Sequence, residues 1–230
     1  MPCYPPYLPS YRRFKSAFQL SEGVTLGHLQ EGKQTLMSGL TSFFSRGNDS
    51  GDPAKCAEDT DIFVALNAST VELLDLEAYC NEKAASRPMI LWNMELDTLR
   101  ADLGLLGFPP KELQYRFLSQ FKPVFYIRQR DYSKTVAVSP FIINYSGALF
   151  REYPGPWQVM LRQDNGVYAC VAEDSMRRYG LGEFKVELAK AMGLDTEQEG
   201  SAMAFLRSGY KTSTWWEDDI DKECSNHWRT

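Results

Sequence analysis

The chain has 230 residues, 43% hydrophobic and 24% charged, which is the composition of a globular protein with material for one large core. Its formal net charge of -5 argues against a protein that coats nucleic acid, because the phosphate backbone favours a basic face. No apolar run approaches the roughly 20 residues that a membrane-spanning helix needs.

Sequence motifs for catalysis, cofactors and metals are missing. The chain has no G-x-G-x-x-G after a strand, no phosphate loop, no H-E-x-x-H and no G-x-S-x-G. Its five cysteines include no C-x-x-C pair, which predicts neither a disulfide framework nor a zinc site. We therefore expect no catalytic residues, no metal and no cofactor, and the sequence leans away from an enzyme.

The first 21 residues predict an extended N-terminal arm. They contain four prolines and no acid, and their three tyrosines, Tyr4, Tyr7 and Tyr11, can serve as partner-binding side chains. A remnant of an organelle-targeting segment is the alternative. Residues 24–44 then show the spacing of an amphipathic helix, and residues 46–60 have the composition of a flexible loop.

An α/β pattern follows from residue 61. Short apolar runs at 62–67, 88–93 and 123–130 predict buried strands, and helical stretches lie between them. Ser69 and Glu72 form a capping box at the start of the first of these helices. Strands that alternate with helices predict right-handed crossovers and a parallel sheet core.

The stretch from Phe141 to Glu173 predicts antiparallel strands, with a type I′ turn at Asn165-Gly166. Its aromatic residues suit either a stacking platform or, more naturally, the packed face of the sheet. The expected fold is a single α/β domain over residues 22–208. Its mixed sheet has a parallel core, an antiparallel extension, and helices on both faces.

Helical patterns return at 182–192 and 196–206, before an acidic tail over residues 209–230. This tail contains Trp215, Trp216 and Trp228, which it cannot bury by itself. The tail therefore either folds back onto the domain or offers these rings to a partner.

Topology predicts one candidate ligand site. Ligands of open α/β sheets bind beyond the carboxyl ends of the parallel strands, and those ends here carry Asn67, Asn93, Arg128 and Arg130. Amides and arginines can bind a phosphate-bearing or polar small molecule. The alternative is structural: the asparagines tie loops or cap helices, and the arginines pair with neighbouring acids.

Several segments resemble a known family. They are DIFVAL, ILWN, LLGFPPKELQYRFLSQFKPVFYIR, YSGALFREYPGPWQVML and YACVAE. They look like a domain of unknown function found in plastids and cyanobacteria, which occurs in the low photosystem II accumulation assembly factor and as an appended part of a plastid adenylate kinase. The kinase activity belongs to other domains of that protein, and this chain lacks the phosphate loop it would need.

The resemblance implies a non-catalytic protein of the chloroplast stroma or the stromal face of the thylakoid. Its partner would be a photosynthetic membrane protein complex, such as photosystem subunits, to which it binds as an assembly factor or accessory subunit. Nucleic acid is not an expected partner. The alternative function is a small-molecule binding protein or enzyme that uses the ends of the parallel strands.

Overall fold

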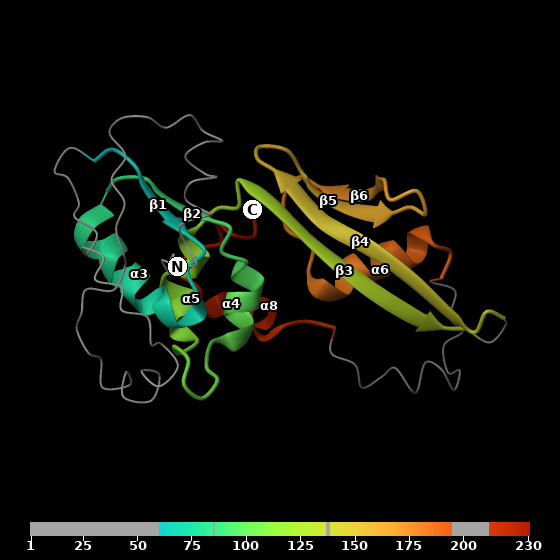
Figure 1. Cartoon of the computed structure of the whole chain (residues 1–230), viewed down its shortest axis with the longest axis horizontal. Coiled ribbons are helices and arrows are strands. Elements are labelled where there is room, and N and C mark those ends of the chain that lie inside the picture. The colour runs from blue at the N-terminus through green and yellow to red at the C-terminus, as the bar shows by residue number, and fades with distance from the viewer. Residues whose placement is uncertain (1–59, 85, 137–138, 195–211) are drawn as a thin grey trace, which may run out of the picture. The chain divides into compact units, whose positions relative to one another are not determined.

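The structure is a computed structural model that describes residues 60–84, 86–136, 139–194 and 212–230. The chain divides into two compact units, residues 1–111 and residues 112–230. The sequence predicts instead a single domain over residues 22–208. Unit 1 contains a parallel pair of strands, and unit 2 contains a four-stranded antiparallel sheet (Figure 1).

Unit 1 contains two parallel strands, each followed by short helices. The strands pair in register from Phe63 with Met89 to Leu66 with Trp92. The Glu72 carboxylate accepts the Ser69 backbone N–H at 2.7 Å at the start of the first helical segment, as the capping box predicts. The elements are β1 (Phe63–Leu66), η1 (Thr70–Glu72), α3 (Leu73–Tyr79), the π-helical turn η2 (Cys80–Ala84), β2 (Met89–Trp92) and α4 (Leu96–Asp102).

The core of unit 1 depends on helix α3. Its leucines Leu73 and Leu76 are fully buried, as are Ala84 and Leu103, which follow α3 and α4. Burying a leucine side chain contributes about 1.5–3 kcal/mol. We infer that the two strands are held by this apolar layer, because a pair of short strands is not stable alone.

Unit 2 is organised around a sheet with the strand order β3-β4-β5-β6. All neighbouring strands are antiparallel, and β3 pairs with β4 over all eleven of its residues. The elements are α5 (Glu112–Arg116), η3 (Leu118–Gln120), β3 (Phe125–Thr135), β4 (Ile142–Glu152), β5 (Trp157–Arg162), β6 (Tyr168–Asp174), α6 (Leu181–Ala191), α8 (Trp215–Asp218) and η4 (Ile220–Lys222).

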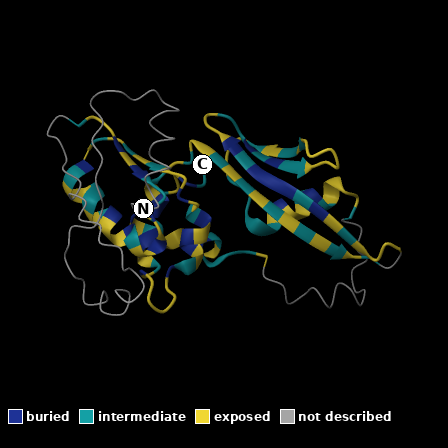
Figure 2. Cartoon of the chain, in the orientation of Figure 1, coloured by how far each residue is buried: buried dark blue, intermediate teal, exposed yellow. Residues whose placement is uncertain are grey.

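The two faces of this sheet differ, because successive side chains of a strand point to opposite sides. The inner face packs against α6, which contributes Phe184 and Leu188 to the core. Figure 2 shows the resulting alternation of burial along β3 and the buried stretch in the middle of β4. The buried residues of the inner face are Tyr145, Leu149, Trp157 and Val159.

Gly147 allows α6 to lie close to the sheet. A Cβ atom at this position would lie 2.6 Å from both Cδ atoms of Leu188 and 2.7 Å from the Met160 carbonyl oxygen. These distances are too short for any side chain. Leu188 can therefore pack this closely on the strands only because residue 147 is glycine.

The predicted α/β class, with parallel and antiparallel strand pairs, is confirmed. One detail differs, because the third predicted strand belongs to the antiparallel sheet and the strands form two sheets, not one. That strand also continues to Thr135. Its inner face carries Arg128, Arg130 and Lys134 among the tyrosines, so the apolar signal fades before the strand ends.

The hairpin predicted between β5 and β6 is confirmed, but its turn is not type I′. Gly166 has a φ of 82°, whereas Asn165 does not have the positive φ that a type I′ turn requires. The Asn165 side chain instead accepts the Val167 N–H at 2.9 Å. The arm over residues 1–21 and the helices expected at 24–44 and 196–206 lie outside the described residues, as does the predicted loop except Thr60.

Candidate functional site

Asn67 and Asn93 occupy matching positions directly after the parallel strands. Because Leu66 pairs with Trp92, the next residue of each strand emerges at the same edge of the sheet. The Asn93 side-chain amide donates a hydrogen bond of 2.7 Å to the Asn67 Oδ1 atom. The structure thus brings together two of the four residues predicted to bind a ligand.

The backbone around this amide pair is left-handed at three residues that are not glycine. Asn67, Asn93 and Glu95 have φ angles of 51°, 52° and 45°. Asparagine tolerates this conformation better than most residues, but glutamate does not. Strained backbone of this kind clusters at functional sites, so the edge formed by these three residues is the candidate site of unit 1.

A buried ion pair lies two residues further along, in α4. The Arg100 Nη1 atom is 3.0 Å from the Asp97 Oδ1 atom, and both side chains are buried. Removing one partner of such a pair costs about 3–5 kcal/mol, because the other charge stays buried. The Asp97–Arg100 ion pair thus lies inside the structure of α4. The hydrogen bond between Asn67 and Asn93, in contrast, is exposed and can meet a ligand.

Arg128 and Arg130 lie elsewhere, in mid-strand on β3 of unit 2. Both face the side of the sheet that α6 covers, because they pair with Leu149 and Gly147 on β4. The prediction that they end a parallel strand is wrong, since β3 is antiparallel to β4 and continues to Thr135. A site built from the tips of three parallel strands therefore does not form.

The tryptophans of the C-terminal segment pack within unit 2. Trp216 is 6% exposed and Trp228 is 1% exposed. Trp215 packs edge-to-face on Tyr115 of α5, with ring centroids 6.1 Å apart. The prediction that these rings are presented to a partner is therefore corrected for Trp216 and Trp228, whose rings are enclosed by this chain itself.

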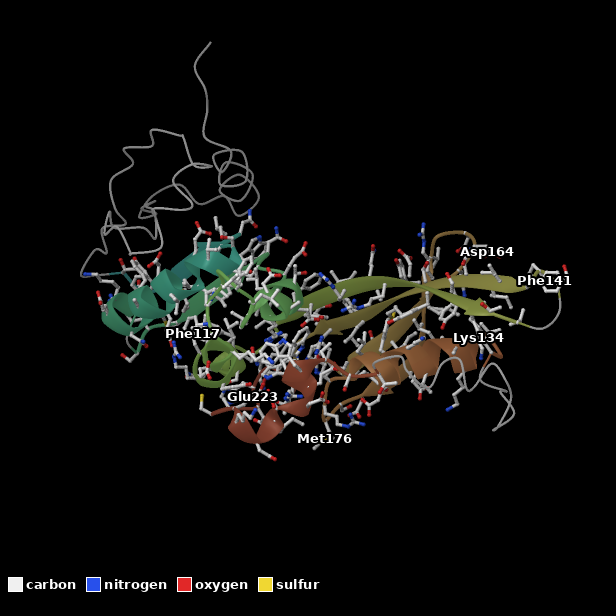
Figure 3. The ribbon with its side chains drawn as sticks, turned by 90° about the horizontal axis from the view of Figure 1, so that it is seen from below. Phe117, Lys134, Phe141, Asp164, Met176 and Glu223 are labelled. Atoms are coloured by element: carbon white, nitrogen blue, oxygen red, sulfur yellow. The ribbon has the colours of Figure 1, made fainter. Side chains whose placement is uncertain are left out.

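Hydrogen bonds tie the same segment to α5. The Tyr115 hydroxyl donates to Asp219 at 2.6 Å, and burial, followed by this hydrogen bond, raises the pKa of Tyr115. Gln114 donates to the Glu223 carboxylate at 2.8 Å. Figure 3 labels Glu223 on this C-terminal segment, and it labels Lys134 and Phe141 at the tip of the β3–β4 hairpin.

Unit 2 also contains a feature that the sequence does not predict, which we call the cation–aromatic ladder. Positive groups and rings alternate along it at contact distances typical of cation–π pairs. The cation-to-centroid distances along the ladder are Lys122 to Tyr153, 4.7 Å; Arg151 to Tyr153, 5.3 Å; Arg151 to Trp157, 5.1 Å; Arg178 to Trp157, 5.7 Å; Arg178 to Trp228, 5.2 Å; and Arg229 to Trp228, 4.1 Å.

Acids accompany one end of the ladder. Glu223 accepts a hydrogen bond of 3.0 Å from Arg229 Nε and two from the Trp228 indole N–H. Glu217 lies 4.0 Å from Arg178. Because the ladder joins residues from 122 to 229, no local pattern in the sequence can reveal it. The one signal is Arg151, a charged residue at a strand position whose side chain points to the core.

The fold and site define a two-unit α/β protein whose notable polar features are an exposed amide pair and a cation–aromatic ladder. The model of the family described as a domain of unknown function (DUF1995) matches residues 11–185, and the chain belongs to this family. This confirms that the resemblance is to a domain of unknown function. No curated protein and no solved structure matches the chain significantly.

Two further features are absent from the described parts of the chain. In these parts, no three His, Cys, Asp or Glu side chains are grouped so that they can hold a metal ion. Within the same residues, no helix is both long enough and apolar enough to cross a membrane.

Proposed function

We propose that this chain is a non-catalytic plastid protein that docks on a photosynthetic membrane complex from the stromal side, as an assembly factor or accessory subunit. The resemblance of its core segments to the plastid and cyanobacterial domain supports the location and the kind of partner. One structural observation supports the docking mode, and it lies on the outer face of the four-stranded sheet.

This outer face carries an apolar patch of three residues, Phe125, Ile127 and Phe150, which we call the outer patch. Phe125 is 68% exposed and Ile127 is 53% exposed. Phe150 pairs directly with Ile127 across the strands, and its ring centroid lies 5.7 Å from that of Phe125. Contiguous exposed apolar side chains mark interaction surfaces, whereas single exposed ones are common.

The strand that carries most of the patch is also an edge of the sheet. An edge strand offers unpaired N–H and C=O groups, and partner proteins use such edges to add a strand. A partner can therefore combine apolar contact with backbone pairing at β3.

The test is recovery of thylakoid complexes with the tagged full-length chain, followed by mass spectrometry. Ile127→Glu should lower recovery of the complex, because a charge in the outer patch must be desolvated on binding. Val186→Glu is the matched control, since Val186 is 57% exposed on α6, away from the patch. Equal recovery with both variants would contradict docking through the outer patch.

The amide pair of unit 1 favours a second candidate function, the binding of a polar or phosphate-bearing small molecule. A ligand that binds the native state must raise the melting temperature, so a thermal-shift screen with nucleotides and sugar phosphates tests it. Asn93→Ala should remove any shift, and Asn144→Ala on β4 should not. The absence of a shift from every compound would count against this function.

A further inference from the structure

Arg151 is a buried cation with an unusual environment. It is 4% exposed, on the inner face of β4, and its cross-strand neighbours are Tyr126 and Trp157. Its Nε and Nη1 atoms are enclosed and have no hydrogen-bond partner in the described part of the chain. Of the residues that the structure describes, Tyr153 and Trp157 place their rings against the guanidinium as cation–π partners.

The charges along the ladder are unevenly balanced. Arg178 and Arg229, at one end, lie beside Glu217 and Glu223. Among the residues that the structure describes, no carboxylate forms an ion pair with Arg151, and burial lowers the pKa of its guanidinium. The end of the ladder that contains Arg151 therefore carries excess positive charge.

Aromatic rings stabilise a guanidinium through its flat faces, but they leave its N–H groups in the guanidinium plane without acceptors. Burying such N–H groups without acceptors is costly, and more so when they belong to a charged group. A buried unsatisfied group in a native protein calls for an explanation, and an anion that accepts these bonds is one.

We propose that the Arg151 guanidinium is the hydrogen-bond donor at the bottom of an oxyanion-binding site. This site takes a carboxylate or phosphate group at the Lys122 end of the ladder. The planar guanidinium matches the paired oxygens of these two groups, and no other side chain recognises them with comparable geometry. Lys122 is exposed and lies on the Tyr153 ring, where it adds attraction for the incoming anion.

Tyr153 controls access to this site. Its ring contacts both Arg151 and Lys122, and it is itself exposed, at the end of β4. An anion that approaches from the Lys122 end therefore meets the Tyr153 ring before it reaches the guanidinium. The site therefore belongs to unit 2 alone and does not depend on the proposed docking function.

The experiment titrates the purified full-length chain with sodium phosphate and, separately, with sodium acetate, at constant ionic strength kept by sodium chloride. Two readouts are followed: the melting temperature and the arginine Nε–Hε signals in nitrogen-15 NMR spectra. Binding should raise the melting temperature and shift one arginine signal. If neither anion produces either change in the unaltered chain, the proposal is overturned, and no variant is needed for that result.

Variants then locate the site. Arg151→Lys keeps the charge and loses the paired N–H geometry, so the apparent affinity should fall about tenfold to a hundredfold. Lys122→Met should weaken binding less, because Lys122 only attracts the anion. Arg162→Met is the matched control, an exposed arginine at the end of β5, and its affinity should equal that of the unaltered chain.

Unchanged affinity in both Arg151→Lys and Lys122→Met would also overturn the proposal. If Arg151→Lys does not fold, Lys122→Met and the arginine signals of the unaltered chain still decide the outcome. Stronger binding of acetate assigns the site to carboxylates, and stronger binding of phosphate assigns it to phosphate groups. Because the titration contains no membrane complex, its result is independent of docking through the outer patch.

Discussion

Replacing Trp228 by alanine tests whether the C-terminal segment is part of the core of unit 2. The indole is 1% exposed, and the guanidinium groups of Arg178 and Arg229 lie 5.2 and 4.1 Å from its ring centroid. Truncating a buried tryptophan to alanine costs about 3–5 kcal/mol in unfolding free energy. The loss should reach this range here, because the Glu223 carboxylate also loses the indole N–H as a donor.

The assay is urea unfolding of the full-length chain, followed by near-ultraviolet circular dichroism. The unfolding free energy of Trp228→Phe should lie between those of the unaltered chain and Trp228→Ala, because the variant keeps an aromatic ring but loses the hydrogen bonds to Glu223. Ile220→Ala is the control, an exposed residue of the same segment, and it should change stability by no more than about 0.5 kcal/mol. If Trp228→Ala unfolds like this control, the segment does not pack as described.

Three further substitutions test other parts of the structure by urea unfolding. Gly147→Ala should destabilise unit 2 by about 1–3 kcal/mol, because the new methyl group meets Leu188, while Gly180→Ala, with room for a Cβ, should change little. Asn67→Ala should cost about 1–2 kcal/mol, through the lost amide bond and a left-handed backbone, and Asn67→Gly should recover part of it. Burial raises the pKa of Tyr132 to about 12 from its ordinary 10.0, so folding loses stability as pH rises from 10 towards 12. Tyr132→Phe should therefore show a flatter stability profile above pH 10, and equal slopes for the two proteins would contradict this explanation.

The parts of the fold that depend on local pattern could be predicted from the sequence. The apolar runs around Phe63 and Met89 form the two parallel strands, and the capping box at Ser69 starts the helix between them. The contact between Asn67 and Asn93 follows from the same logic, because residues after neighbouring parallel strands emerge side by side. Whether that amide pair binds a ligand stays a prediction.

Long-range pairing could not be predicted in the same way. The inner face of β3 mixes tyrosines with Arg128, Arg130 and Lys134, and only the pairing with β4 shows that the strand is antiparallel and extends to Thr135. The ladder depends on contacts between residues that are distant in the sequence, so Trp228 carries no local signal and Arg151 carries only that of a charged residue at a core-facing strand position. Within the tail, an acid and a tryptophan contact each other directly, since the Glu223 carboxylate accepts the Trp228 indole N–H.

The ladder also determines how late during synthesis unit 2 can finish folding. A ribosome that has finished β3 must add roughly a hundred residues before Trp228 and Arg229 exist, which takes about 5–20 s at ordinary translation rates. During that interval the nascent sheet lacks the indole on which Arg178 packs in the folded protein. Unit 2 can therefore complete its core only after the C-terminal segment has been synthesised, because Trp228 is one of its buried residues.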